Sequence, residues 1–188
     1  MPAPRWVVGD LLRVVALVSV AVGAAGWGFV GFALFMLVLG GTMIPRALGA
    51  PTSLDVTYCS VLLLGAWAAV LDLYLRIAWL DTVVHAAATG LIAVVAYVVM
   101  VRVAMLPVEV SRAGRVVVAT GAGTALALVW EVLEWAGHLL ADDRIQVGYE
   151  DTLGDLVSGL LGAAVAGAVL LSDTLVRGAA GPRAGSRA

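Results

Sequence analysis

The feature that most constrains this chain is a series of apolar segments, each long enough to cross a lipid bilayer. The first covers residues 11–44, and Arg13 is its one charged side chain. A transmembrane helix needs about 20 apolar residues. Hydrophobic residues make up 62% of the chain and charged residues 13%, whereas about a quarter of a soluble domain is charged. We therefore predict an all-α, polytopic integral membrane helix bundle.

Glycine, proline and polar stretches divide the apolar sequence into about six predicted transmembrane helices in a single domain. Residues 11–44 are too long for one span and are interrupted by "GAAGWG" (23–28), so we split them into two helices joined by a tight turn. The stretches "PRALGAPTS", "LRIAWL", "PVEVSRAGR" and "ADDRIQVGYE" are predicted connections. The predicted spans are 12–25, 28–44, 54–74, 81–105, 116–140 and 151–176, followed by a disordered tail at 177–188.

The arginines are unevenly divided between the two ends of this predicted bundle. With six spans, only Arg76 and Arg144 of the eleven basic residues lie on the side opposite the termini. Short cytoplasmic segments are enriched in Arg and Lys. We therefore predict a multi-pass protein of the inner (plasma) membrane with both termini cytoplasmic and the acidic loop at 141–150 facing outward.

Charge and cysteine content exclude several classes of protein. The net charge of −2 provides no basic surface for nucleic acid. Cys59 is the single cysteine, which excludes an internal disulfide and a thiolate metal cluster and favours a buried core position. We expect no cleavable signal peptide, because the first apolar run continues far beyond a typical one.

The stretch "WEVLEWAGHLL" (130–140) places three ionisable residues in an apolar helix. Glu131, Glu134 and His138 are spaced i, i+3 and i+7, so they lie on one stripe of an α-helix, within an arc of about 60°. A charged residue near the centre of a span costs ~2.5–3.5 kcal/mol on insertion scales. The stripe must therefore face protein, water or an ion rather than lipid.

Two other predicted helices carry pairs of ionisable residues at a similar depth. Asp81 and His85 in "WLDTVVH", and Asp151 and Asp155 in "YEDTLGD", are each spaced i, i+4. The predicted topology places both pairs in the outer turns of their helices. Inward Glu and His residues on facing helices build metal sites in bundles, and oxygen and nitrogen ligands without thiolate suit Zn, Mn, Fe or Mg.

We therefore predict a divalent metal ion, with Zn, Mn and Fe as the leading choices. Glu131, the deepest of the acidic residues, is the predicted catalytic acid or base. The predicted metal ligands are Asp81, His85, Glu134, His138, Asp151 and Asp155.

Simpler interpretations exist for each residue taken alone. Asp81 and Asp151 stand where helices begin and could be N-caps. A single histidine is more often a hydrogen-bonded core residue than a ligand. Glu131 could form an ion pair with Arg76 or Arg144. The joint spacing on three helices favours a functional polar site over these alternatives.

Small residues and tryptophans have mainly structural interpretations. The run "SGLLGAAVAG" (158–167) lets the last helix pack closely, which would bring Asp155 toward the two preceding helices. Tryptophans near predicted span ends are typical of interface anchors.

Three stretches, "WLDTVVHAAATG", "ALVWEVLEW" and "GYEDTLGDLVSGLLGA", resemble a bacterial six-helix inner-membrane family typified by YjdF-like proteins, whose molecular function is not established. A looser likeness extends to VanZ-like membrane proteins. The resemblance covers residues 50–170 and implies a polytopic membrane protein with this polar site, without implying a substrate. The family pattern falls on Asp81, His85, Glu131, Glu134, Asp151 and Asp155, and less clearly on His138.

Three functional hypotheses follow. In the first, the metal lowers the pKa of a bound water molecule and the site acts on a membrane lipid or a lipid-linked substrate. In the second, the protein is a proton- or cation-coupled transporter, although the predicted cytoplasmic half has few ionisable groups. In the third, it is a non-catalytic accessory protein with a structural polar network. The excess of acidic and histidine residues over arginine argues against the third hypothesis.

Overall fold

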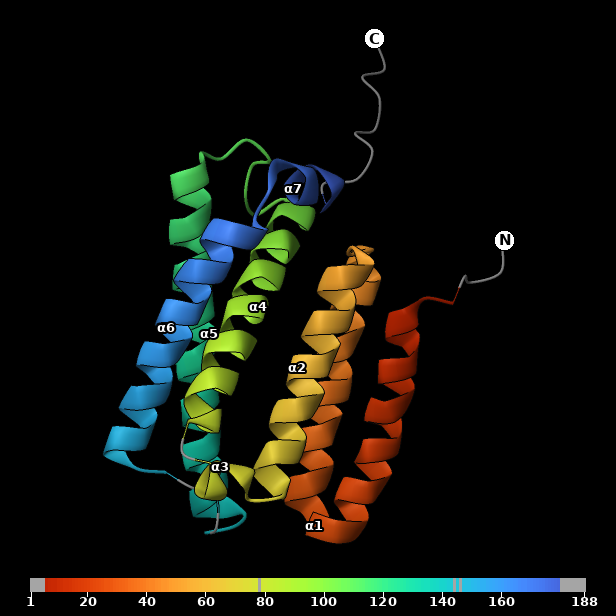
Figure 1. Ribbon diagram of the computed structural model, residues 1–188, viewed down its shortest axis with the longest axis vertical. Helices are drawn as coiled ribbons and strands as arrows, with labels where there is room; N and C mark the ends of the chain where they lie inside the picture. Colours follow the sequence, from red (N-terminus) through yellow and green to blue (C-terminus); the bar gives the residue numbers. More distant parts are fainter. Residues whose placement is uncertain (1–5, 78, 144, 146, 180–188) are drawn as a thin grey trace.

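The computed structural model describes residues 6–77, 79–143, 145 and 147–179, and these residues form helices without strands (Figure 1). Arg144 and the tail from residue 180 onward, including most of the predicted disordered segment, lie outside the described residues. The helices are α1 (Val8–Leu48), α2 (Thr52–Val70), α3 (Leu73–Arg76), α4 (Leu80–Arg102), α5 (Arg112–Leu140), α6 (Tyr149–Leu170) and α7 (Asp173–Ala179).

Five of these helices, all except α3 and α7, are long and apolar enough to cross a membrane. Large apolar side chains along them are exposed, such as Leu17 on α1, Leu64 on α2 and Val165 on α6. In a bilayer these surfaces face lipid. The prediction of an all-α polytopic membrane bundle is confirmed.

Helix α1 is a hairpin of two antiparallel arms, 8–27 and 29–48 (Figure 1). The chain reverses at Gly28, whose φ of 62° and ψ of −141° are not helical and favour glycine. The arms touch closely at Gly31, where an added Cβ would lie 2.4 Å from the carbonyl oxygen of Gly23. The two arms and the four other long helices make six long helical segments, and the break at Gly28 falls within the predicted turn at residues 23–28.

Some helix ends differ from the prediction. The second arm continues through Pro45 and ends only at Gly49, whose φ of 65° is a left-handed helix cap. Helix α6 ends at Leu170 instead of continuing to residue 176. The Ser172 hydroxyl accepts a hydrogen bond from the Leu175 N–H at 3.3 Å and so caps α7 as a separate helix.

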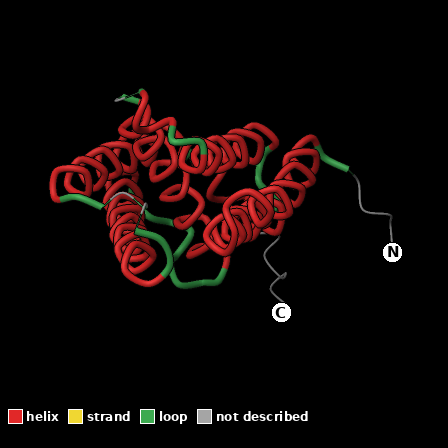
Figure 2. Tube along the Cα trace, turned by 90° about the horizontal axis from the view of Figure 1, so that it is seen from below, coloured by secondary structure: helices red, strands yellow, loops and turns green. Residues whose placement is uncertain are grey.

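Helix α4 is the central element of the bundle. It packs against α5 and α6 on one side and against α1 and α2 on the other, and Figure 2 shows these helices side by side when the molecule is seen nearly end-on. An apolar core of α4, α5, α6 and α7 residues includes Tyr97, Val98, Ala119 and Val176. We call the end with the α1 turn, α3 and the α5–α6 connection the site end, and the end with α7 and the start of α1 the terminal end.

A network of charged residues is buried at the terminal end, where the two arms of α1 meet α2. The guanidinium of Arg13 forms an ion pair with Asp55, donates to the Thr42 carbonyl oxygen at 3.0 Å and contacts Asp10 at 3.2 Å. Arg46 contacts the same Asp10 oxygen at 3.2 Å. The side chains of Arg13 and Asp55 are only 8% and 6% exposed. Two positive and two negative charges therefore fasten three helical segments together.

Candidate functional site

Helices α4 and α6 cross at a distance that only glycine allows. A Cβ added to Gly162 would lie 2.0 Å from the carbonyl oxygen of Ala86, and one added to Gly90 would lie 2.7 Å from the carbonyl oxygen of Gly162. The predicted close packing through residues 158–167 is therefore confirmed. This crossing lies one to two helical turns from His85 and Asp155, and it holds these two side chains close together.

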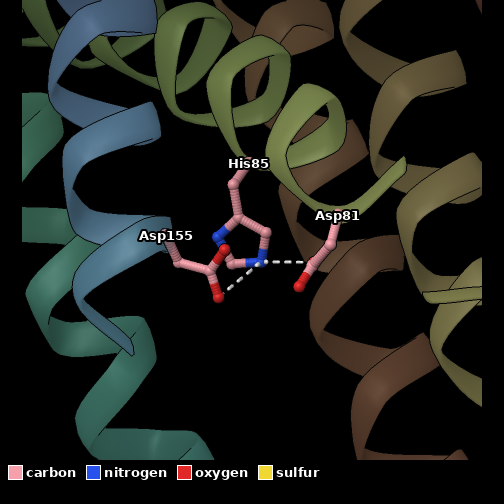
Figure 3. Close-up of side chains that lie close together, drawn as sticks. All are labelled: Asp81, His85 and Asp155. Carbon is pink, nitrogen blue, oxygen red and sulfur yellow. Dashed lines mark ion pairs between the residues drawn. The ribbon is translucent and has the colours of Figure 1, made fainter. Parts of the chain in front are cut away.

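Asp81, His85 and Asp155 form the centre of the site (Figure 3). The Nε2 atom of His85 lies 3.4 Å from Oδ1 of Asp81 and 3.7 Å from Oδ2 of Asp155. One potential ligand atom from each residue lies within 4.8 Å of the other two. Asp155 is buried, and Asp81 and His85 are partly buried. The i, i+4 spacing on α4 and the close approach of α6 thus bring together three residues predicted as ligands.

Helix α5 contributes two glutamates beside this centre. Glu131 is buried, with 7% of its surface exposed, and the Thr152 side chain of α6 is among the groups that act on its carboxylate. Glu134 is partly buried. The carboxylates within electrostatic range of Glu134 are those of Glu131, Asp155, Asp151 and Asp81. Three helices therefore place their acidic residues around one region, as the sequence predicts.

His138 lies on the same helix but is engaged with the α5–α6 connection. Its Nδ1 atom is 2.8 Å from the carbonyl oxygen of Ile145. It is not one of the three residues whose ligand atoms converge. Its assignment as a metal ligand therefore stays a prediction, as do those of Glu134 and Asp151.

The interpretation of Asp81 and Asp151 as N-caps is wrong. The N-cap positions of α4 and α6 are occupied by Trp79 and Gly148, and both aspartates lie inside the first helical turns. The partial positive charge of a helix N-terminus stabilises carboxylates there, but its effect fades after the first turn. Asp155 lies beyond that turn, so its burial requires another source of positive charge or protons.

Tyr74 on α3 belongs to the surroundings of the site and is absent from the predicted set. Its hydroxyl donates a hydrogen bond to the Gly65 carbonyl oxygen of α2 at 3.0 Å. Burial raises the pKa of the Tyr74 phenol, and the nearby charges of Asp81, Glu134 and Asp155 raise it further. The residue was missed because it falls at the junction of a predicted span and a predicted connection, where its position in the sequence does not indicate which residues it contacts.

Arginine partners for these carboxylates were a predicted alternative. Among the described residues, the ion pairs of the cluster involve His85 and no arginine. Arg76 is exposed on α3, and Arg144 lies outside the described residues. The described cluster therefore carries an excess of negative charge wherever its carboxylates are ionised.

The fold and this site define a class: a polytopic helical membrane protein with an intramembrane cluster of acidic residues and histidine. The chain belongs to the family described as "Predicted membrane protein (DUF2238)", whose model matches residues 6–175. No curated protein matches the chain, and no solved structure does.

Proposed function

We propose that this protein binds a divalent metal ion at its site end through Asp81, His85 and Asp155. The observation that carries the proposal is the convergence of one imidazole nitrogen and two carboxylates within 4.8 Å of one another, from two different helices. Three protein ligands with an open position are typical of catalytic zinc sites. One nitrogen and two oxygen ligands also suit Mn and Fe.

The residues around the centre support hydrolytic chemistry. A bound metal ion would supply an activated water molecule. Glu134 lies near the centre and could complete the ligand set, and the buried Glu131 could exchange protons as a general acid or base.

A lipid or lipid-linked substrate fits the surroundings of the site. Trp79, Trp135 and Tyr149 are 65%, 55% and 81% exposed on the helices that carry the cluster. Aromatic residues at helix ends lie at the level of lipid head groups. A substrate that stays in the membrane would reach the site at this level.

We place the protein in the bacterial inner membrane with the site facing outward. Among the described arginines, only Arg76 is at the site end, and the other six lie at the terminal end. A periplasm-dependent reporter enzyme should be active when inserted at residue 143 and inactive when fused after residue 188. The reverse pattern would contradict this orientation.

Metal content is the decisive experiment. The protein would be purified in mild detergent without chelators, reloaded with Zn, Mn and Fe in turn, and analysed by elemental mass spectrometry. We expect near-stoichiometric metal in the wild type and at least a tenfold loss of affinity in Asp155→Asn.

Asp72→Asn is the matched control, because Asp72 lies at the same end outside the cluster and has a φ of 54°, a conformation that asparagine tolerates. It should retain the wild-type metal content. Absence of metal from the reloaded wild type, or equal metal in Asp155→Asn, would overturn the proposal.

Proton- or cation-coupled transport is the second candidate, and three buried hydroxyls favour it. The hydroxyls of Tyr97, Thr120 and Thr124 have no hydrogen-bond partner among the described residues. They lie on α4 and α5 toward the terminal end, where few ionisable groups were expected. Proteoliposomes containing a pH-sensitive dye would report proton flux. Flux that Glu131→Gln abolishes would favour transport, and its absence under every ion gradient would exclude proton coupling.

A further inference from the structure

A cavity lies at the terminal end, at the opposite end of the bundle from the acidic cluster. It has a volume of about 460 Å³ and is lined by residues of α5, α6 and the turn into α7, among them Arg112, Arg115, Ala168, Ser172 and Asp173. Two guanidinium groups and one carboxylate give its lining a net positive charge. Neither the family nor the acidic cluster assigns a role to this cavity.

The two arginines are held at the wall of the cavity by bonds that leave donors available. Arg112 donates from Nη2 to the Ala168 carbonyl oxygen at 3.1 Å. Arg115 donates from Nε to the Val110 carbonyl oxygen at 3.0 Å, and its Nη1 lies 2.5 Å from Asp173. A guanidinium has five N–H donors in a planar fork, so the contacts among described residues do not exhaust either group. The arginines are thus positioned to bind an additional anion.

Asp173 already serves as an anionic partner of Arg115. Its side chain is 64% exposed, whereas that of Arg115 is 11% exposed. The chain itself brings this carboxylate to Arg115, because Ser172 caps α7 and the buried Leu171 and Val176 fix the turn. An exposed carboxylate paired with a more buried arginine can be displaced by an anion with more oxygen atoms.

The position of the cavity selects the kind of anion. Helix α5 begins at Arg112 and α6 ends at Leu170, so the cavity lies where two spanning helices leave the hydrocarbon layer. Phosphate groups of membrane lipids are concentrated at this level, and basic pockets between transmembrane helices bind anionic head groups. Arginine forks match the geometry of phosphate oxygens.

We propose that this cavity binds the phosphate group of an anionic phospholipid, held by Arg112 and Arg115 in partial competition with Asp173. The shared chemistry is a phosphate oxyanion, and a soluble phosphate is the alternative source. Because the cavity is far from the acidic cluster, this proposal is independent of metal binding.

Native mass spectrometry of the purified full-length protein tests it with phosphatidylglycerol, phosphatidylcholine and inorganic phosphate as separate probes. We expect a single phosphatidylglycerol to bind at least tenfold more tightly than phosphatidylcholine, and Arg112→Gln to remove most of this preference. Arg177→Gln, an equal charge change on the exposed surface of α7, should leave the preference within about twofold.

A gain of affinity provides a test that poor folding cannot imitate. Asp173→Asn removes the competing carboxylate and should strengthen phosphatidylglycerol binding several-fold. Equal binding of the two lipids, or an unchanged preference in Arg112→Gln, would overturn the proposal. Competition by inorganic phosphate at millimolar concentration, without a preference between lipids, would also overturn it and identify a soluble phosphate as the ligand.

Discussion

Two buried polar clusters lie at opposite ends of this molecule and differ in their balance of charge. At the terminal end, Arg13 and Arg46 contact Asp10 and Asp55, so two cations meet two anions. At the site end, among the described residues, five carboxylates lie near one another, and the only basic ion-pair partner is His85, which pairs with Asp81 and Asp155. These carboxylates are Asp81, Glu131, Glu134, Asp151 and Asp155.

The difference separates a structural role from a functional one. A buried ion pair that is complete within the chain needs nothing from outside, and it fails when one partner is removed. A buried cluster with excess negative charge needs a bound cation or retained protons. The terminal cluster therefore stabilises the packing of α1 against α2, and the site cluster is the candidate functional site.

The largest expected effect on stability comes from removing one charge of the terminal cluster. Asp55→Asn removes the most buried ionic partner of the Arg13 guanidinium and leaves it only Asp10, which it shares with Arg46, and we expect a loss of about 3–5 kcal/mol in the free energy of unfolding. Denaturant titration in mild detergent would measure this loss. The double substitution Arg13→Met/Asp55→Leu, which removes both charges, should recover most of it. Wild-type stability in Asp55→Asn alone would contradict the structural role.

The next effect tests the close crossing of α4 and α6, the two helices that carry His85 and Asp155 of the site cluster. The Cβ of Gly162→Ala would collide with the backbone of Ala86, and overpacking of this kind costs about 1–3 kcal/mol. Unfolding and metal content would be measured together, because separation of the helices also moves His85 away from Asp155.

Gly154→Ala on the same helix is the matched control, since nothing lies within 4 Å of its added Cβ. This substitution should stabilise α6 by about 0.5–1 kcal/mol, because alanine is the better helix former. Equal effects at Gly162 and Gly154 would show that close packing does not form the site.

The fold was largely predictable because the membrane imposes a simple rule on sequence. Apolar segments of bilayer length, separated by glycine and proline, indicated the six long helical segments, including the reversal near Gly28. The break after Leu170 was missed although Ser172, Asp173 and Thr174 interrupt the apolar sequence there, and Ser172 caps α7 as a separate helix. The predicted start of the loop at Pro45 was wrong because the helix continues to Leu48, and Gly49 rather than the proline caps it.

For the site, the sequence allowed a prediction of which residues share a helix face, but not of which side-chain atoms converge. The i, i+4 pair of Asp81 and His85 could be read from spacing, and the small residues of α6 indicated the approach of Asp155. Which ligand atoms converge depends on side-chain conformations that spacing does not encode, and so the bond from His138 to Ile145 was not foreseen. Arg13 and Asp55 were likewise not paired, because 42 residues separate them in sequence.

A charge-neutralising substitution in the cluster at the site end should change the free energy of unfolding in the opposite direction to Asp55→Asn. In protein treated with a chelator, Glu134→Gln removes one of several neighbouring negative charges, and we expect the free energy of unfolding to rise by about 0.5–2 kcal/mol. The same denaturant titration measures it. A loss as large as that of Asp55→Asn would mean that the glutamate has a cationic partner within the chain and that the contrast between the clusters does not hold.

The smallest effect concerns Tyr74, which contacts both α2 and the surroundings of the acidic cluster. Tyr74→Phe removes its hydrogen bond to the Gly65 carbonyl oxygen, which should cost about 0.5–1.5 kcal/mol, and the retained ring should leave the metal content unchanged. Tyr149→Phe, at an exposed position of the same end, is the control and should change neither quantity. Loss of metal from Tyr74→Phe alone would make the phenol part of the site, and α3 would then supply a functional group as well as a connection.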